Sequence, residues 1–426
     1  MTVAVRDSVG RLFPRKTLPV ESGSLRRPEV RMSTLTDSGL RSALTGAGGV
    51  IALLLGAISC NPDRGTAARE FVWSDDESVS PSFTSAYVSP NNARSLILEA
   101  DGGVQIVFTG NTDYYYDIFY ARRTGRGWEK PEQLSFTGAP SSTPCLALDR
   151  AGNPCVAWSD RDTGEYDILL SRRESGAWKM AENVTHDSTS SLFPAMTRSQ
   201  DGALHLVWED RWGDASRILY ACSSDSEWSE PVCLSSEDAE ATAPSIAAAS
   251  DGTVWAVWTE RRKTREGVVC RELSDGDWRR PVQLSGGRHP GARPSVAAGS
   301  GGSVHVVWED HRHDKPAVCY RQKMGRGWQP EVLLTDGRSK AFRPVVAAGP
   351  RGTVYVAWYD DRWGVPQAAV RVGESGRWGL VFRVNHSDAP TYFVTIEVDR
   401  HGGAHLLFQD RRRGTYDVYY KQGAVQ

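Results

Sequence analysis

Seven aromatic residues spaced 50 residues apart predict that this chain of 426 residues is all-β: a seven-bladed β-propeller of four-stranded antiparallel blades, with its ring closed by an N-terminal strand. Two more sets of residues keep the same spacing, a turn glycine before each aromatic and a tryptophan after six of them. The phased aromatics are Phe108, Trp158, Trp208, Trp258, Trp308, Trp358 and Phe408. The turn glycines are Gly102, Gly152, Gly202, Gly252, Gly302, Gly352 and Gly402, and the later tryptophans are Trp128, Trp178, Trp228, Trp278, Trp328 and Trp378.

The third copy reads as four strands in order. Residues 195–198 are expected to lie nearest the axis, and residues 204–208 follow after a tight turn at 201–202, where glycine tolerates positive φ. Both faces of 204–208 are apolar, as in a strand between two neighbouring sheets. Residues 217–222 form the third strand, and 228–234 the outer strand, where a proline is tolerated at an edge.

The last copy lacks its outer strand, because the chain ends after its third strand at residues 416–422. The segment 70–74 (EFVWS), upstream of the first copy, is the only suitable donor. We predict that it completes the last blade, because ring closure removes two exposed sheet edges.

Three regions are expected along the chain: an N-terminal extension with a signal peptide at 1–60, a linker at 61–69 and the propeller at 70–426. The apolar run 43–59 is short for a membrane span, and the residues that end it, Ala57-Ile58-Ser59-Cys60, resemble a bacterial lipobox in which Cys60 is lipidated. We therefore expect a protein of the bacterial cell envelope, lipid-anchored at the outer membrane or periplasmic face, or secreted. An ordinary signal peptide with a chance cysteine is the alternative.

Six cysteines follow Cys60, and export would permit disulfides between them. Cys145 and Cys155 flank one predicted turn, and Cys222 and Cys233 flank another, so either pair could bridge a hairpin. Free buried thiols at blade interfaces are the alternative.

The repeat Val-Trp-x-Asp-x-Arg-x-Gly, Ile-x-Tyr-x-Arg and Gly-x-Trp-x-x-Pro-x-x-Leu, seen for example in AWSDRDTGEYDILLSRRESGAW at 157–178, resembles that of sialidase-like (BNR, Asp-box) propellers. The resemblance covers residues 70–422 and implies the propeller architecture. The family's Asp box, Ser-x-Asp-x-Gly-x-Thr-Trp, survives only in fragments such as 274–278 (SDGDW). Its Phe/Tyr-Arg-Ile-Pro motif, which carries one arginine of a catalytic triad, has only Phe342-Arg343-Pro344 as a counterpart. These departures favour a binding protein over an enzyme.

A polar loop with acidic and basic members follows each phased aromatic and is expected on the rim that usually binds ligands. Because the pair recurs in six blades, we expect it to fix loops through ion pairs rather than to form one active site. Its members are Asp160/Arg161, Asp210/Arg211, Glu260/Arg261, Asp310/Arg312, Asp360/Arg362 and Asp410/Arg411.

The histidines are also interpreted as structural. His205, His305 and His405 share one position in alternate blades and are expected at blade interfaces. His311 and His313 could bind a metal ion weakly, but two histidines on a polar loop are more often solvated. We expect neither a metal nor a cofactor.

Residues that differ between copies are the better candidates for a site, since exposed aromatics stack on sugar faces and arginines bind anionic groups. The predicted ligand-binding residues are Tyr114, Tyr116, Trp212, Arg261, Arg262, Arg293, Arg343 and Trp363. Sialidase chemistry would need a tyrosine nucleophile beside a carboxylate. The candidates for it are Tyr115, Tyr392, Asp113 and Glu260, with Tyr359 and Asp360 as further choices. Ordinary packing and solvated surface are the alternative interpretation of all these residues.

The formal net charge of −2, with no Lys/Arg block in the repeat region, argues against nucleic acid as a partner. We expect an exported propeller that binds a glycan or protein ligand on its loop face without catalysis, and that meets the membrane through its lipid anchor. An exo-sialidase-type glycoside hydrolase is the alternative, and a structural envelope scaffold is a third option.

Overall fold

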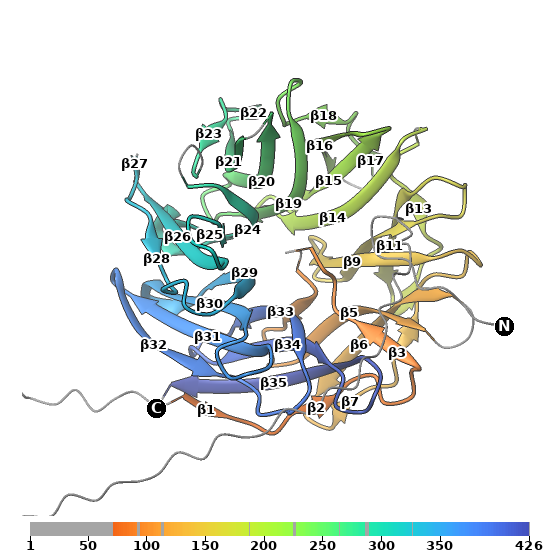
Figure 1. The fold of residues 1–426 in the computed structure, drawn as a ribbon. Coiled ribbons are helices and arrows are strands. Elements are labelled where there is room, and N and C mark those ends of the chain that lie inside the picture. Colours follow the sequence, from red (N-terminus) through yellow and green to blue (C-terminus); the bar gives the residue numbers. More distant parts are fainter. Residues whose placement is uncertain are drawn as a thin grey trace, which may run out of the picture. The chain divides into compact units, whose positions relative to one another are not determined.

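The computed structural model describes residues 71–425 apart from 92–93, 112–114, 187, 225–226, 264, 286–288 and 326. The expected signal segment, Cys60, Asp113 and Tyr114 lie outside the described residues. The described part is a ring of seven antiparallel sheets around a central axis (Figure 1), so the predicted seven-bladed propeller is confirmed. No helix in this part is long and apolar enough to cross a membrane.

Strands run outward from the axis in sequence order within blades 1 to 6, and in blade 7 the N-terminal strand is the outermost. Blade 1 contains β3 (Ser85–Tyr87), β4 (Leu96–Leu98), β5 (Val104–Asn111), β6 (Tyr116–Thr124), β7 (Gly127–Trp128) and β8 (Glu132–Gln133). Blade 2 contains β9 (Ser141–Leu148), β10 (Pro154–Asp160), β11 (Asp167–Glu174), β12 (Ala177–Trp178) and β13 (Glu182–Asn183). Blade 3 contains β14 (Ser190–Arg198), β15 (Leu204–Trp212), β16 (Ala215–Ser224), β17 (Glu227–Trp228) and β18 (Val232–Cys233).

Blades 4 to 7 repeat this order, and blade 6 has a continuous outer strand where blades 1 to 5 have two short pieces. Blade 4 contains β19 (Glu240–Ala248), β20 (Val254–Arg262), β21 (Arg265–Ser274), β22 (Asp277–Trp278) and β23 (Val282–Gln283). Blade 5 contains β24 (Gly291–Ala298), η1 (Ser300–Gly302), β25 (Val304–Asp310), β26 (Ala317–Met324), β27 (Gly327–Trp328) and β28 (Val332–Leu333). Blade 6 contains β29 (Ala341–Ala348), η2 (Pro350–Gly352), β30 (Thr353–Asp360), β31 (Gln367–Glu374) and β32 (Arg377–Arg383). Blade 7 contains β33 (Thr391–Val398), β34 (Ala404–Asp410), β35 (Asp417–Val425), β1 (Phe71–Trp73) and β2 (Glu77–Ser78).

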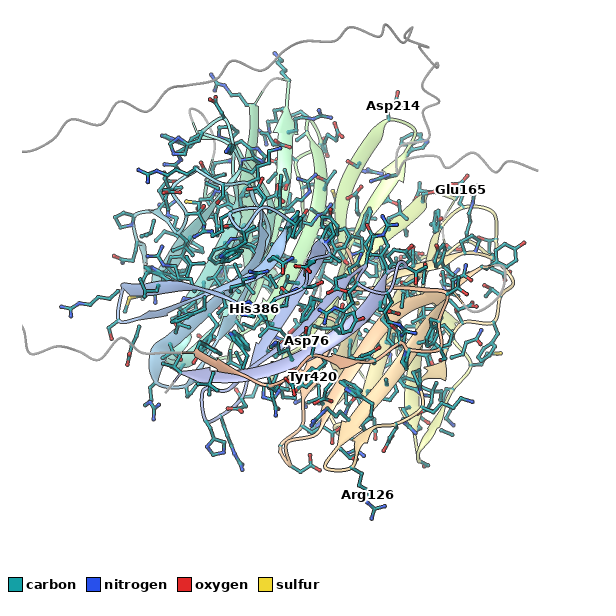
Figure 2. The ribbon with its side chains drawn as sticks, turned by 60° about the horizontal axis from the view of Figure 1, so that its bottom comes forward. Asp76, Arg126, Glu165, Asp214, His386 and Tyr420 are labelled. Carbon is teal, nitrogen blue, oxygen red and sulfur yellow. The ribbon has the colours of Figure 1, made fainter. Side chains whose placement is uncertain are left out.

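The ring closes as predicted, with the first described strand on the last. β1 pairs antiparallel with β35, and Phe71 lies opposite Val425. Asp76, labelled with Tyr420 in Figure 2, accepts a hydrogen bond from Lys421 Nζ (2.7 Å). The N-terminal segment is therefore held to blade 7 by backbone pairing, apolar packing and charge together.

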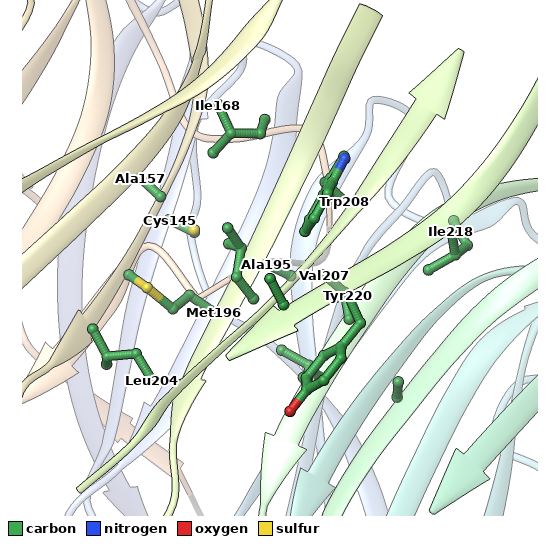
Figure 3. Close-up of a cluster of buried hydrophobic side chains, with 14 of the residues drawn as sticks. Cys145, Ala157, Ile168, Ala195, Met196, Leu204, Val207, Trp208, Ile218 and Tyr220 are labelled. Atoms are coloured by element: carbon green, nitrogen blue, oxygen red, sulfur yellow. The ribbon is translucent and has the colours of Figure 1, made fainter. Parts of the chain in front are cut away.

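The phased aromatics form the centre of each blade, and each is 0 % exposed. Figure 3 shows how the side chains of blade 2 meet those of blade 3 in one cluster. The cluster shown there includes Cys145, Ala157, Ile168, Met196, Leu204 and Trp208. The stacking of neighbouring sheets explains why both faces of each second strand are apolar.

The seven turn glycines between the first and second strands all adopt the expected left-handed conformation. Their φ values run from 71° at Gly302 to 95° at Gly202. Other residue types adopt this conformation less easily, so the spacing of these glycines is a backbone requirement.

The inner strands differ from the prediction, because they begin earlier and contain a bulge. In blade 3 the strand begins at Ser190 rather than at residue 195, and its register with β15 shifts between Leu192 and Ala195. Proline has no N–H to donate, so its presence is compatible with a break in the ladder at this point. The residues with positive φ at the equivalent positions are Thr143, Phe193, Ala243, Arg293, Arg343 and Phe393.

The six cysteines of the described chain are free, so neither hairpin disulfide is formed. Cys145, Cys155, Cys270 and Cys319 are buried, and Cys222 and Cys233 are half-buried. Antiparallel pairing sets Cys145 opposite Ala157 rather than opposite Cys155. The alternative of buried thiols packed among the blades therefore holds for four of them.

Candidate functional site

The loops of each blade divide between two rims. Loops that join the second strand to the third lie on the same rim as the loops that join one blade to the next, and this rim is here called the 2–3 rim. Thr137, in a loop between two blades, donates a hydrogen bond from Oγ1 to Oδ1 of Asp160, where a loop between second and third strands begins (3.0 Å). The turns that join strands one to two and three to four form the opposite rim. In Figure 2, Glu165 and Asp214 of the 2–3 rim lie on the other side of the ring from Arg126.

The central channel is too narrow for a sugar ring. The cavity between the inner strands measures about 30 Å³. Arg94 Nε and Glu397 Oε1 form an ion pair there, 2.6 Å apart. A ligand on this axis must therefore bind at the mouth of the channel, on the rim loops.

The acidic residue repeated on the 2–3 rim is structural. Asp160 is 1 % exposed and accepts hydrogen bonds from Trp158 Nε1 (2.9 Å) and Ser141 Oγ (2.7 Å). Asp360 is held in the same way by Trp358 Nε1 (2.8 Å). In blades 2 and 6, a buried carboxylate bound to the phased tryptophan therefore fixes its loop.

The arginines of this loop pair less regularly than the sequence suggests. Arg312 Nε bonds to Asp310 (2.6 Å), as expected. Where the arginine directly follows the acidic residue, it bonds to another group. These partners are the Gly164 carbonyl for Arg161, Glu209 for Arg211, Glu240 for Arg261 and the Gly414 carbonyl for Arg411. An arginine two positions after the acidic residue points to the same side and can bond to its carboxylate. An arginine directly after the acidic residue points to the opposite face of the strand and cannot.

A repeated contact between blades fixes the bulged residues at the mouth of the channel. The side chain directly after the phased aromatic accepts a hydrogen bond from the bulged backbone N–H of the next blade. Thr259 Oγ1 accepts from Arg293 N (2.8 Å), and Glu309 Oε1 accepts from Arg343 N (2.8 Å). The two arginines are thus held by their own backbones, which leaves their guanidinium groups to other partners.

Six aromatic rings form a continuous arc on the 2–3 rim across blades 6, 7 and 1, here called the aromatic arc. In order they are Phe342, Tyr359, Tyr392, Tyr416, Tyr87 and Tyr116. Successive ring centroids lie 5.4, 5.4, 6.3, 5.3 and 5.4 Å apart. Tyr116 is exposed and the others are half-buried, so the arc presents aromatic surface to solvent.

An arginine cluster, formed by Arg293, Glu309, His311 and Arg343, adjoins the arc. Arg293 Nη1 bonds to Glu309 Oε2 (2.8 Å), and the carboxylate is 1 % exposed while the arginine side chain is 44 % exposed. The Arg343 guanidinium donates to the Pro90 carbonyl and lies 4.9 Å from the ring centroid of Phe393. Two guanidinium groups and one buried carboxylate leave an excess of positive charge beside the rings.

Burial and hydrogen bonding set the protonation states of these groups. Burial raises the pKa of Tyr359 and of Tyr392, and burial with Tyr87 beside it raises the pKa of Tyr116 to about 12. Although burial opposes it, hydrogen bonding from His311 and the nearby arginine charges lower the pKa of Glu309. At neutral pH the site therefore holds protonated tyrosines, which donate hydrogen bonds and are poor bases.

The structure brings five of the predicted site residues to one region, among them Tyr359 of the aromatic arc. Tyr116, Tyr392, Arg293 and Arg343 belong to the arc and the cluster. Trp212 lies at the tip of the β15–β16 hairpin of blade 3, 72 % exposed. Tyr115 is 49 % exposed beside the arc residue Tyr116.

The remaining candidates of blades 4 and 6 are occupied by neighbouring groups. Arg261 pairs with Glu240, and Arg262 pairs with Glu260 (3.3 Å). Glu260 also accepts a hydrogen bond from Ser236 N (2.9 Å), a contact that orders the loop after the outer strand.

Trp363 of blade 6 is packed between two arginines. The guanidinium carbon of Arg362 lies 5.6 Å from its ring centroid, and that of Arg383 lies 5.7 Å away. A tryptophan held between cations has less free face for a ligand.

The tyrosine candidates have different neighbours, and those of Tyr359 include the carboxylate of Glu309 and the guanidinium of Arg343, whose charges act on its pKa. The ring contacts of Tyr392 are Tyr359, Phe393 and Tyr416. Within the described residues, no group of three or more His, Cys, Asp or Glu side chains is placed to hold a metal ion. Arc and cluster together can stack on a ligand and neutralise its charge.

Several residues of the site were not predicted, among them Glu309, Tyr87 and Tyr416. Glu309 directly follows the phased Trp308, where blade 3 also has a glutamate, Glu209, and the other copies have serine, threonine, tyrosine or glutamine. The position directly after the phased aromatic differs among the copies, and this difference is the sequence signal that could have identified Glu309. Tyr87 lies outside the repeat phase, and only ring closure brings it to Tyr416.

No protein-family model matches this sequence, and no curated protein matches it. Solved structures share the fold at low identity. An ulvan lyase of polysaccharide lyase family PL25 is 10 % identical over 79 % of this chain and 94 % of its own, with a TM-score of 0.59. The polysaccharide lyase Uly1 is 10 % identical over 82 % of this chain and 91 % of its own, with a TM-score of 0.51.

A sialidase is also similar, at a greater structural distance. The Hadza microbial sialidase Hz136 is 13 % identical over 75 % of this chain and 73 % of its own, with a TM-score of 0.46. The sheet topology itself shows that the chain is a seven-bladed β-propeller, as its repeat predicted.

Proposed function

We propose that this protein is an exported, lipid-anchored propeller of the bacterial cell envelope that binds an acidic glycan on the aromatic arc and the arginine cluster, without catalysis. The observation that carries the proposal is the continuity of the six rings with two arginines at the mouth of a channel too narrow to admit a sugar. Anchoring through Cys60 would hold the protein at the envelope.

The arc suits a chain of sugar units better than a single small molecule. Rings spaced between 5.3 and 6.3 Å apart extend across three blades, so successive units can each stack on one ring. Five of the six rings are tyrosines, and each adds a hydroxyl donor from which sugar hydroxyls can accept.

The arginine cluster favours an acidic glycan over a neutral one. The Arg293 guanidinium is part-exposed, so a carboxylate or sulfate can reach it while Glu309 stays buried. Bidentate bonds from guanidinium to such groups are among the strongest side-chain hydrogen bonds. The ulvan lyase of similar fold is described in complex with -[GlcA(1-4)Rha3S]-, an acidic saccharide, which supports this choice.

Binding is favoured over hydrolysis by the protonation of the tyrosines. A nucleophilic tyrosine needs an adjacent carboxylate to accept its proton. Burial raises the pKa of Tyr392, and its described ring contacts are all aromatic. These observations favour binding over hydrolysis at Tyr392, and Tyr359, which lies near Glu309, is the tyrosine that the hydrolase alternative would use.

Calorimetric titration of the purified protein with acidic oligosaccharides tests the proposal. The panel consists of ulvan oligosaccharides, oligogalacturonate, oligoalginate and sialyllactose. We expect at least one to bind, with an affinity that falls as salt is raised. Arg343→Ala should weaken that binding by about 10-fold or more, because a charge-assisted hydrogen bond is lost.

Arg126→Ala is the matched control, since it removes the same charge from the opposite rim. Equal binding by Arg343→Ala and Arg126→Ala, or no binding by any acidic oligosaccharide, would overturn the proposal. Turnover of a fluorogenic sialoside that is lost in Tyr392→Phe would establish the hydrolase instead.

A further inference from the structure

A second concave surface lies on the opposite rim, between blades 5 and 6, and it is independent of the proposed function of the 2–3 rim. It is a groove of about 850 Å³, within the size range of ligand pockets. The walls come from β26 and from the turns at η1, η2 and residues 374–376. The lining residues on which the argument depends are Tyr320, Gln322, Gln329, Gly373, Glu374 and Trp378.

At the groove, one blade lacks a side chain that other blades have. At four blade interfaces a tyrosine meets the outer tryptophan of the next blade edge to face. These pairs are Tyr420–Trp128, Tyr120–Trp178, Tyr220–Trp278 and Tyr320–Trp378, with centroids 5.3, 5.0, 4.9 and 4.8 Å apart. The residue paired with each tryptophan in the ladder is Arg123, Arg173, Leu273 and Gly373, respectively.

The longer side chains cover the tyrosine at their interfaces. The Arg123 guanidinium lies 5.5 Å from the ring centroid of Tyr420, and that of Arg173 lies 5.7 Å from that of Tyr120. Leu273 packs in the same cluster as Tyr220. Gly373 has no side chain to provide such cover, and the Tyr320–Trp378 pair lines the groove, with Trp378 half-buried and Tyr320 6 % exposed at its base.

The polar groups around the aromatic pair suit hydroxyl groups. The side-chain amides of Gln322 and Gln329 line the groove, and neither has a hydrogen-bond partner among the described residues. Each amide presents two donors and an acceptor, the pattern that adjacent hydroxyls satisfy. Tyr320 is held in place, since its hydroxyl bonds to His305 Nδ1 (2.8 Å).

The charges around the groove balance each other. Glu374 and Arg351 both line it, so neither sign predominates. An aromatic floor with amides and balanced charge matches a ligand that has an apolar ring face and many hydroxyls.

We propose that this groove is a second binding site, which takes a neutral saccharide of two or three units against Tyr320 and Trp378, with Gln322 and Gln329 bonding its hydroxyls. A peptide would need charged or backbone-pairing groups along its length, and the groove provides an aromatic pair with amides instead.

Saturation-transfer difference NMR on the purified protein, with maltotriose, cellotriose, laminaritriose and xylotriose as probes, tests this site. We expect at least one to bind. Gly373→Arg, which copies Arg173, should abolish the signal by filling the groove. A Cβ at this position would lie 3.0 Å from the Trp378 ring, so that ring must shift in this variant. Gln322→Ala leaves the backbone and the aromatic pair intact and should weaken binding by about fivefold or more.

Arg343→Ala separates this site from the 2–3 rim, and trisaccharide binding should be unchanged in it. Four outcomes would each overturn the inference: no trisaccharide binds, the signal survives in both groove variants, Arg343→Ala abolishes it, or the groove variants lose only a peptide ligand. Failure of acidic oligosaccharides to bind would bear on the 2–3 rim alone.

Discussion

Truncation of Phe71 tests whether the first described strand closes the ring energetically as well as geometrically. Phe71 is 6 % exposed, stacks on Trp73 (centroids 4.2 Å apart) and meets Phe382 of blade 6 (5.5 Å). Replacing a buried phenylalanine by alanine typically costs about 3 to 5 kcal/mol. Because β1 pairs with β35 over only three residues, we expect the lower end of that range for Phe71→Ala, about 3 kcal/mol.

The assay is thermal unfolding followed by circular dichroism and calorimetry. With an unfolding entropy of about 2 cal/mol/K per residue over roughly 350 residues, a loss of about 3 kcal/mol lowers Tm by about 4 °C. Val72→Ala is the matched control, because Val72 lies in the same strand but is 46 % exposed. It should lower Tm by about 1 °C or less, since little apolar area is lost. Equal shifts in the two variants would refute the view that Phe71 stabilises the closure.

Two further predictions concern buried titratable groups. Burial lowers the pKa of His305 to about 4, below the value near 6.5 in the unfolded chain. The unfolded state therefore binds the proton more readily than the folded state. The contribution of neutral His305 to stability should be full above about pH 6.5 and be lost as the pH falls towards 4. His305→Gln, which copies Gln105 of blade 1, should remove about 2 to 3 kcal/mol of that fall in urea unfolding at pH 7 and 4.5, and an unchanged pH dependence would contradict this. Burial also raises the pKa of Cys145, Cys155 and Cys270 to about 12, so Ellman's reagent should modify the half-buried Cys222 and Cys233 first under native conditions. Mass spectrometry of the modified protein gives the order. Rapid modification of Cys145 would argue against the packing described.

Much of the fold could be read from the sequence because its determinants are local and repeated. Glycines with φ between 71° and 95° mark each inner turn, and fully buried aromatics mark each second strand. The closing strand was predictable by counting, since the outer tryptophans numbered one fewer than the turns. The bulge at the mouth of the channel was missed, because a proline marks a strand without showing which residue before it takes positive φ.

The candidate site was only partly predictable. Arg293, Arg343 and Tyr392 were found because they precede the inner strand in copies that differ there. Trp212 was chosen by the same argument, but it lies on a hairpin tip in blade 3. Sequence shows that a residue is unusual for its copy, and it does not show which unusual residues of different copies become neighbours.

By itself, the sequence determined the number of blades, the order of strands and the identity of the buried aromatics, because a repeat imposes the same local pattern on every copy. Only the tertiary structure decided that Tyr87, Tyr416 and Tyr392 form one aromatic surface, and that Gly373 lines a groove between blades 5 and 6. Both features arise between blades. Ring closure sets residues from opposite ends of the chain side by side, and the surface at a blade interface depends on the side chains of both neighbouring blades.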